Sequence, residues 1–249
     1  MIGHVARGKG SGVLFLHGFA LDARAWEPQL EGLADQHRSI AVDLPGFGPH
    51  PVATPGVSAA AAALAVLDAL EVDRVHVVGH SLGGAIAADF ALAFPHRVRT
   101  LVLVDPLMRG RDPKIAAWNR CVELARANEL GDALEAWLAD PLFAAASKNA
   151  GVAAKLRAIA MDYRGAHWRG EMSTAFERDP PTADVLAQIL APTLVVVGEH
   201  DLPSFHAMAD EYASTVRHAR KVVVPNAGHV PNLEAPDAFN ARLTELFAA

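Results

Sequence analysis

Short apolar runs rich in valine and leucine alternate along the chain with longer helical patterns. The runs lie at residues 13–16, 75–78, 100–104, 193–197 and 222–224. Buried parallel strands read as continuous apolar runs, and helices between such strands are typical of an α/β fold. The pattern therefore predicts one mostly parallel sheet flanked by helices, and the 249 residues are enough to bury a sizeable core.

A short glycine-rich motif follows the apolar run at 75–78. Residues 79–83 read Gly-His-Ser-Leu-Gly, and an alanine-rich helical pattern comes next. A strand, a sharp G-x-S-x-G turn and a helix form a nucleophile elbow, in which the glycines let neighbouring backbone approach without a Cβ clash. The turn would hold the Ser81 hydroxyl at a helix N-terminus, where the dipole favours a developing negative charge. Taken alone, the motif is equally typical of a turn that only packs a helix on a strand.

A serine nucleophile needs a histidine base and an acid that orients the histidine. Among the 12 histidines, His229 is the expected base, because it follows a glycine at the end of a late strand. Asp201 is the expected acid, because it ends the preceding strand in a turn that contains Gly198. Asp105, at the end of the run 100–104, is a competing acid that could reach the same histidine.

Acyl transfer also needs donors for an oxyanion. One expected donor is the backbone N–H of Leu82, the residue after the serine. The other is the N–H of Phe19, because His17-Gly18-Phe19 follows the first strong apolar run and Gly18 lets the backbone turn inward.

These motifs together resemble the α/β-hydrolase superfamily. The matching segments are residues 16–19, 43–48, 79–84, 198–201 and 226–236, in the order and spacing of that family. The resemblance implies a triad of Ser81, Asp201 and His229, and an α/β-hydrolase fold with a helical cap inserted after the sixth strand. Members commonly begin with a β-hairpin, whereas about a dozen residues precede Val13 here, so one short strand at Ile2–Ala6 is expected.

The stretch between the runs 100–104 and 193–197 is too long for a loop. Its patterns predict helices at 115–128, 131–138, 150–163 and 170–176. The resemblance implies that residues 107–181 form a cap over a core of residues 1–106 and 182–249. A cap excludes water and shapes the acyl pocket. The aromatic and methionine side chains expected to include the pocket lining are Met108, Trp118, Trp137, Phe143, Met161, Trp168 and Phe176.

Basic residues gather near the start of the same stretch, at Arg109, Arg111, Lys114 and Arg120. A solvated basic face is one interpretation. Recognition of an acidic substrate tail is the other, and the sequence leaves both open.

Composition and the absence of certain motifs limit the partners, cofactors and cellular compartment to be expected. The net charge is −6 and no basic stripe stands out, which argues against nucleic acid. The single cysteine, Cys121, cannot form an internal disulfide and fits a reducing compartment. No signal-peptide core, bilayer-length apolar segment, metal-ligand spacing or phosphate-binding loop is found. We therefore expect a cytoplasmic monomer or homodimer that needs no cofactor, metal or membrane.

The leading prediction is a carboxylesterase-type serine hydrolase that cleaves a small to medium ester or lactone. A lyase or C–C bond hydrolase with the same triad is an alternative, and a non-catalytic ligand receptor on the same fold is another. The chain also looks similar to the lyase of menaquinone synthesis, but that lyase typically has an arginine just after the elbow glycines, where Ala85 stands here. Epoxide hydrolases and haloalkane dehalogenases have an aspartate at the position of Ser81.

Overall fold

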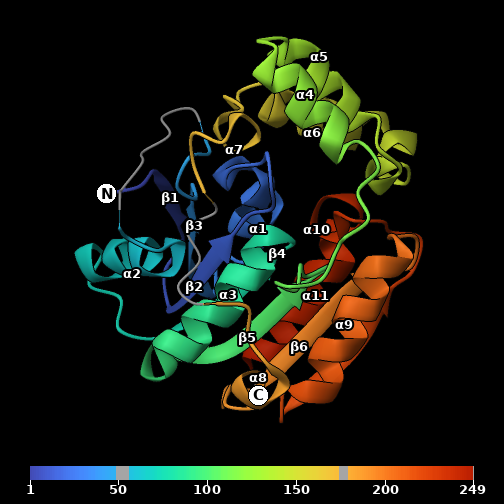
Figure 1. Ribbon diagram of the computed structural model, residues 1–249. Coiled ribbons are helices and arrows are strands. Elements are labelled where there is room, and N and C mark those ends of the chain that lie inside the picture. The colour runs from blue at the N-terminus through green and yellow to red at the C-terminus, as the bar shows by residue number, and fades with distance from the viewer. Residues whose placement is uncertain (49–55, 174–178, 249) are drawn as a thin grey trace.

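A computed structural model describes residues 1–48, 56–173 and 179–248. Its strands are β1 His4–Arg7, β2 Ser11–Leu16, β3 His37–Val42, β4 Val75–His80, β5 Val98–Val104, β6 Thr193–Gly198 and β7 Ala219–Val224. In the described part of the chain they form one seven-stranded sheet in the order β1-β3-β2-β4-β5-β6-β7 (Figure 1). Only β1 runs antiparallel to its neighbour among these strands, so the predicted mostly parallel α/β sheet is confirmed.

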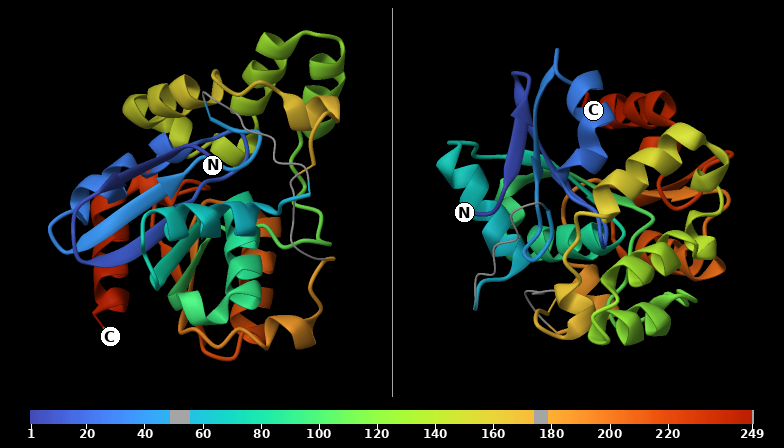
Figure 2. Two further views of the ribbon diagram at one scale, coloured as in Figure 1. Left: turned by 90° about the vertical axis from the view of Figure 1, so that its left-hand side faces the viewer. Right: turned by 90° about the horizontal axis from the view of Figure 1, so that it is seen from above.

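Helices cover both faces of the sheet (Figure 2). One face packs against α2 (Ala59–Ala69), α3 (Leu82–Ala93) and α9 (Pro203–Thr215). The other packs against α1 (Glu27–Gly32) and α11 (Pro236–Phe247).

Alternate residues of the inner strand β2 contribute to the two cores on either side of the sheet. Leu14 and Leu16 lie in one core, Val13 and Phe15 in the other, and all four are fully buried. Burial of one such side chain contributes about 1.5–3 kcal/mol. This two-sided burial is the reason that the strands read as continuous apolar runs.

The sheet begins with one short strand, as expected, although that strand starts at His4 rather than Ile2. β1 pairs with β3 from His4 opposite Val42 to Arg7 opposite Ser39. Because a single strand replaces a hairpin, the long helical insertion follows β5 and not a sixth strand. The predicted sixth-strand position is therefore wrong by one strand.

The insertion between β5 and β6 contains α4 (Trp118–Arg126), α5 (Leu130–Leu138), α6 (Ala150–Ala160), α7 (Ala166–Arg169) and α8 (Ala183–Leu186). Helices α4 to α7 lie beyond the carboxyl ends of the strands (Figure 1). Three predicted helices are confirmed. α4 and α6 are shorter than predicted, and α5 begins one residue earlier than predicted. The fourth, 170–176, is wrong over residues 170–173, because Gly170 (φ 76°) ends α7 in a left-handed conformation. Residues 174–176 lie outside the described residues.

Three further features concern the C-terminal helices, the cysteine and membrane-spanning potential. A short helix, α10 (Pro231–Glu234), follows β7 and leads into α11. Cys121 is buried in α4, and its Sγ donates to the Ala133 carbonyl at 3.2 Å. Within the described ranges, none of the helices is both long and apolar enough to cross a bilayer.

Candidate active site

Ser81 lies in a tight turn between β4 and α3. Its backbone has φ 52° and ψ −115°, which few non-glycine residues adopt. A Cβ on Gly79 would overlap the carbonyl oxygen of Gly83, and a Cβ on Gly83 would overlap that of Leu16. The two glycines therefore let β4, α3 and the end of β2 meet closely. The N–H of Ser81 donates to the Val104 carbonyl at 2.9 Å, which fixes the turn against β5.

Asp201 and His229 come together from the loops that follow β6 and β7. His229 Nδ1 lies 2.9 Å from Asp201 Oδ2, and both side chains are buried. Asp201 Oδ1 accepts from the N–H of Leu202 at 2.7 Å. Burial opposes ionisation of Asp201, but the charge of His229 and the hydrogen bonds outweigh it and lower the pKa of Asp201. An ionised Asp201 favours the tautomer of His229 in which Nδ1 carries the proton and Nε2 is the acceptor.

Backbone contacts and carboxylates hold these two loops together. A Cβ on Gly198 would overlap the carbonyl oxygen of Gly228, so the loops meet without space for a side chain there. Glu199 accepts from the N–H of Asn226 at 2.8 Å, and Glu234 of α10 accepts from the N–H of Gly228. The loop that carries His229 is thus fixed by carboxylates on both sides.

His80, next to Ser81, also contacts this loop. Its Nε2 lies 2.6 Å from the carbonyl oxygen of His229, and both residues are buried. Burial, with a smaller effect of the charge of His229, lowers the pKa of His80 to about 3, so the ring is neutral and Nε2 donates its one proton. Sequence reasoning missed this bond, because its partners are 149 residues apart. The one available signal was the position of His80 beside the serine.

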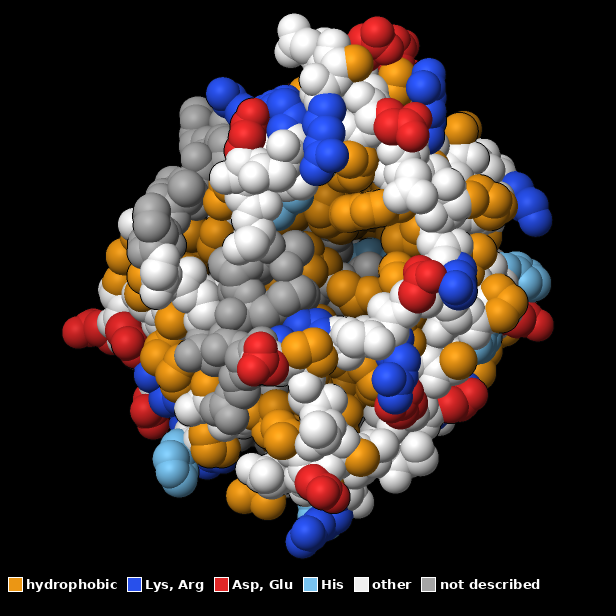
Figure 3. Space-filling model, in the orientation of Figure 1, with side chains coloured by type: hydrophobic (Ala, Val, Ile, Leu, Met, Phe, Trp, Pro, Cys, Tyr) orange, Lys and Arg blue, Asp and Glu red, His pale blue; other side chains and the backbone are white. Residues whose placement is uncertain are grey.

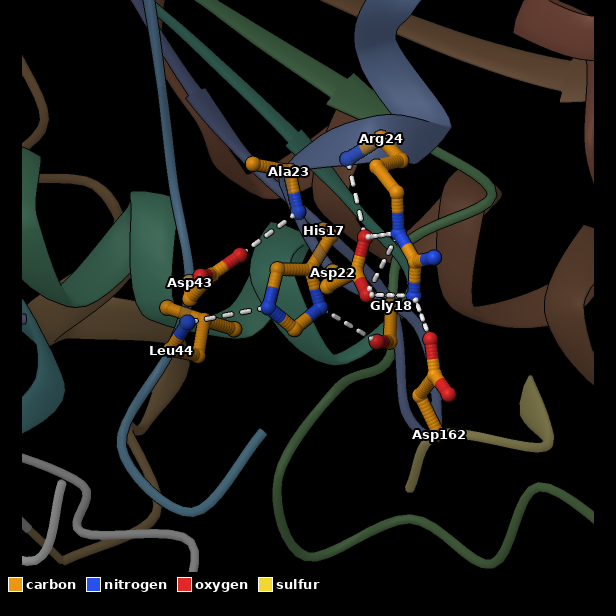
Figure 4. Close-up of polar contacts among 8 residues, drawn as sticks. All are labelled: His17, Gly18, Asp22, Ala23, Arg24, Asp43, Leu44 and Asp162. Carbon is orange, nitrogen blue, oxygen red and sulfur yellow. Dashed lines mark hydrogen bonds and ion pairs between the residues drawn. The ribbon is translucent and has the colours of Figure 1, made fainter. Parts of the chain in front are cut away.

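The loop after β2, which carries Phe19, is fixed by a buried histidine (Figure 4). The N–H of Leu44 donates to His17 Nε2 at 2.9 Å, so the ring proton is on Nδ1 and is donated to the Gly18 carbonyl at 2.7 Å. Burial lowers the pKa of His17, which keeps the ring neutral and able to use both nitrogens. Asp43 accepts from the N–H of Ala23 at 2.9 Å in the same loop.

An arginine ties this loop to the helical insertion (Figure 4). Arg24 Nη2 lies 2.6 Å from Asp22 Oδ2 and 2.7 Å from Asp162 Oδ2, just after α6. The Phe19 ring makes a second tie. Its centroid lies 5.1–5.6 Å from those of Trp118, Trp137, Tyr163 and Trp168, distances at which aromatic pairs attract. Phe19 therefore joins the sheet edge to α4, α5 and α7.

A cavity of about 820 Å³ opens beside Ser81, and Ser81, Leu82, Phe19 and His229 form part of its wall. Most lining side chains are apolar, and Figure 3 shows the hollow with hydrophobic side chains around its mouth. The insertion supplies the other predicted residues that the structure places in this wall, namely Met108, Trp118, Trp137 and Phe143. Apolar walls with a few convergent polar groups are typical of small-molecule sites.

Two predicted lining residues lie elsewhere. Trp168 is fully buried in the cluster around Phe19, and Met161, 40% exposed, faces away at the end of α6. Neither belongs to the described wall of the cavity, so both predictions are wrong. For Met161 the reason is that α6 buries Val152, Leu156 and Ile159 and ends at Ala160, so Met161 follows the apolar stripe. Phe176 lies outside the described residues.

The basic cluster is distributed over four ion pairs. They are Arg109–Asp89, Arg111–Glu211, Lys114–Asp112 and Arg120–Glu123. Arg111, Lys114 and Arg120 are exposed, as a solvated face would be. Arg109, Arg111 and Lys114 all form part of the cavity wall. Arg109 differs from the other two because it is buried with Asp89.

The competing acid, Asp105, lies close to the pair. Within the part of the chain that the structure describes, Asp105, Asp201 and His229 are one group whose ligand atoms all lie within 4.8 Å of one another. This is the spacing that a metal ion would need. The direct bond between Asp201 and His229 already uses one atom of each, which favours a hydrogen-bonded group over a metal centre.

Comparisons with known proteins agree with this geometry. The sequence matches the alpha/beta hydrolase family over residues 13–242. The chain therefore belongs to the alpha/beta hydrolase family. A thermophilic esterase from Thermogutta terrifontis, solved with malate bound, has a similar structure, with a TM-score of 0.84 and 28% identity over 99% of this chain and 93% of the esterase.

Two relatives show how far the similarity extends. The dihydrolipoyllysine-residue acetyltransferase component of the acetoin cleaving system of Cupriavidus necator is 31% identical over 252 residues, or 94% of this chain. The match covers only 64% of that relative's length. The protein named carbamate hydrolase RutD from Azorhizobium caulinodans is 30% identical over 250 residues, covering 95% of this chain and 91% of RutD. Hydrolytic enzymes are thus among the proteins that this chain resembles.

Proposed function

We propose that the protein is a serine hydrolase that cleaves a small to medium carboxylic ester or lactone. One observation carries the proposal. A serine held in a strained turn and a histidine paired with a buried aspartate share the wall of one apolar cavity. The cavity volume of about 820 Å³ suits an acyl group of modest length.

In this mechanism His229 Nε2 takes the proton of Ser81 Oγ as Oγ bonds to the substrate carbonyl carbon. Asp201 stabilises the imidazolium that forms. The protonated His229 then gives its proton to the leaving alcohol oxygen as the C–O bond breaks. A water molecule attacks the acyl-serine with the same histidine as base, which releases the acid and restores Ser81.

The N–H groups of Leu82 and Phe19 would hold the oxyanion. Leu82 is the first residue of α3, so its N–H has no acceptor within the helix, and the helix dipole points there. Phe19 follows Gly18, where a Cβ would come within 2.6 Å of the His80 ring. The glycine thus lets this loop lie against the elbow.

The test is turnover of p-nitrophenyl esters of graded acyl length and of lactones by the purified protein. We expect Ser81→Ala to lower kcat by a factor on the order of 10⁶ while the circular dichroism spectrum stays unchanged. Ser214→Ala, an exposed serine of α9, is the matched control and should keep full activity. Esterase activity retained in folded Ser81→Ala would contradict the proposal. Cleavage of C–C bonds without cleavage of esters would favour a lyase or C–C hydrolase. Absence of turnover with every substrate would favour a receptor.

A further inference from the structure

Asp105 is a buried carboxyl group that the proposed mechanism does not use. It follows β5 directly, has φ 42°, and is 0% exposed. Its Oδ1 accepts from the N–H of Gly198 at 2.9 Å, at the end of the neighbouring strand β6. Its Oδ2 is buried and has no hydrogen-bond donor among the described residues. A bare carboxylate oxygen in this position would be costly, since buried acceptors are almost always paired.

The nearest groups explain what Oδ2 faces. Asp201 and His229 have polar atoms within 4.8 Å of Asp105, and the carboxyl group of Glu234 acts on it from α10. One imidazole cannot neutralise two buried carboxylates at this spacing, so one of them carries a proton. Asp201 already accepts bonds from Leu202 and His229, as an ionised group does.

The electrostatic surroundings of Asp105 and Asp201 also favour a neutral Asp105 and an ionised Asp201. Burial, followed by the charge of Asp201, raises the pKa of Asp105 well above its ordinary range. For Asp201 the opposite direction holds, because the charge of His229 and donated hydrogen bonds outweigh burial. Two interacting acids in different surroundings commonly separate into one neutral and one ionised group.

We propose that Asp105 is a neutral carboxyl group whose Oδ2 proton is donated to Asp201, and that this bond positions the Asp201 carboxylate against His229. Asp201 then accepts three hydrogen bonds, from Leu202, His229 and Asp105, and its orientation is fixed from three sides. Asp105 is a positioning residue in this scheme and touches no substrate. The inference rests on the proposed function, but the protonation state can be measured without turnover.

The first experiment is an infrared difference spectrum at neutral pH between the wild-type protein and Asp105→Asn. We expect a protonated carboxyl band in the wild type that the variant lacks. Asp140→Asn is the matched control, because Asp140 is also buried but both of its oxygens accept backbone N–H groups, as in an ionised carboxylate. That substitution should remove no such band. A wild-type spectrum identical to that of Asp105→Asn in this region would overturn the proposal.

The second experiment is the pH profile of kcat/KM. An asparagine keeps an acceptor for Gly198 and a donor for Asp201, so Asp105→Asn should stay within about threefold of wild type with its acid limb unmoved. Asp105→Leu removes both the acceptor for Gly198 and the donor for Asp201, and should lower kcat/KM about 10- to 100-fold. Its acid limb should move to higher pH, because the charge of Asp201 is less stabilised. If Asp105→Asn moves the acid limb to lower pH, Asp105 is ionised and the proposal is wrong.

The two proposals fail in distinguishable ways. Absence of ester turnover in the wild-type protein would count against the hydrolase, while the infrared band would still test Asp105. Should Asp105→Leu not fold, the asparagine variant and the spectrum still decide the question.

Discussion

Replacement of His80 by alanine gives a direct test of how the His229 loop is held. The substitution removes the donor that lies 2.6 Å from the His229 carbonyl oxygen, in a place where both residues are 3% exposed. A buried acceptor left without its donor costs about 1–3 kcal/mol. If the loop must be restored to its position in the transition state, the same energy lowers kcat by about 5- to 150-fold. We therefore expect a loss in both unfolding free energy and kcat.

The assay is kcat for the best ester of the panel, together with urea unfolding. His80→Gln should recover most of the lost kcat, because the amide of glutamine can donate from nearly the same place. His76→Ala is the matched control, since His76 is a buried histidine of the same strand β4 whose ring bonds Thr100 at 2.8 Å, away from Ser81. It should lose similar stability with little change in kcat. Equal values of kcat in His80→Ala and His76→Ala would refute the reasoning.

Three further predictions concern stability, backbone fit and charge. Burial lowers the pKa of His76 to about 4 from its ordinary value of 6.5, so the unfolded chain binds more protons between these values. Unfolding free energy should fall as the pH falls through this window, and each such buried histidine contributes about 1.4 kcal/mol per pH unit. His76→Phe should therefore reduce the slope by about this amount in urea titrations at several pH values, and an unchanged slope would contradict the prediction. Gly198→Ala forces a Cβ onto the facing loop and should abolish most ester turnover. Gly131→Ala is the control, because its Cβ meets open space in α5, and it should raise the unfolding free energy by about 0.5–1 kcal/mol. Normal activity in Gly198→Ala would show that the loops can separate. Arg111→Ala removes an exposed ion pair with Glu211 and should change KM by less than about twofold, both for a neutral ester and for a dicarboxylate monoester. A rise in KM for the dicarboxylate monoester alone would instead support recognition of an acidic substrate tail.

Local sequence determined the strands of the sheet and the positions of the candidate site residues. Apolar runs marked the strands because both faces of the sheet are covered, so no alternation hides them. The G-x-S-x-G motif indicated the turn at Ser81, because only glycine permits the close approaches found at Gly79 and Gly83. Asp201 and His229 could be selected because parallel strands end at one edge, which brings distant loops together.

Only the tertiary structure decided which side chains complete the site. The bond of His80 to the His229 loop and the approach of Asp105 to Asp201 join segments far apart in the chain, and no local pattern encodes such contacts. The same holds for the insertion. Periodicity shows that a helix has an apolar face, but not whether this face meets a neighbouring helix or a cavity. Trp137 lines the cavity and Trp168 does not, because the packing of the helices around Phe19, rather than residue type, sets the direction of each ring.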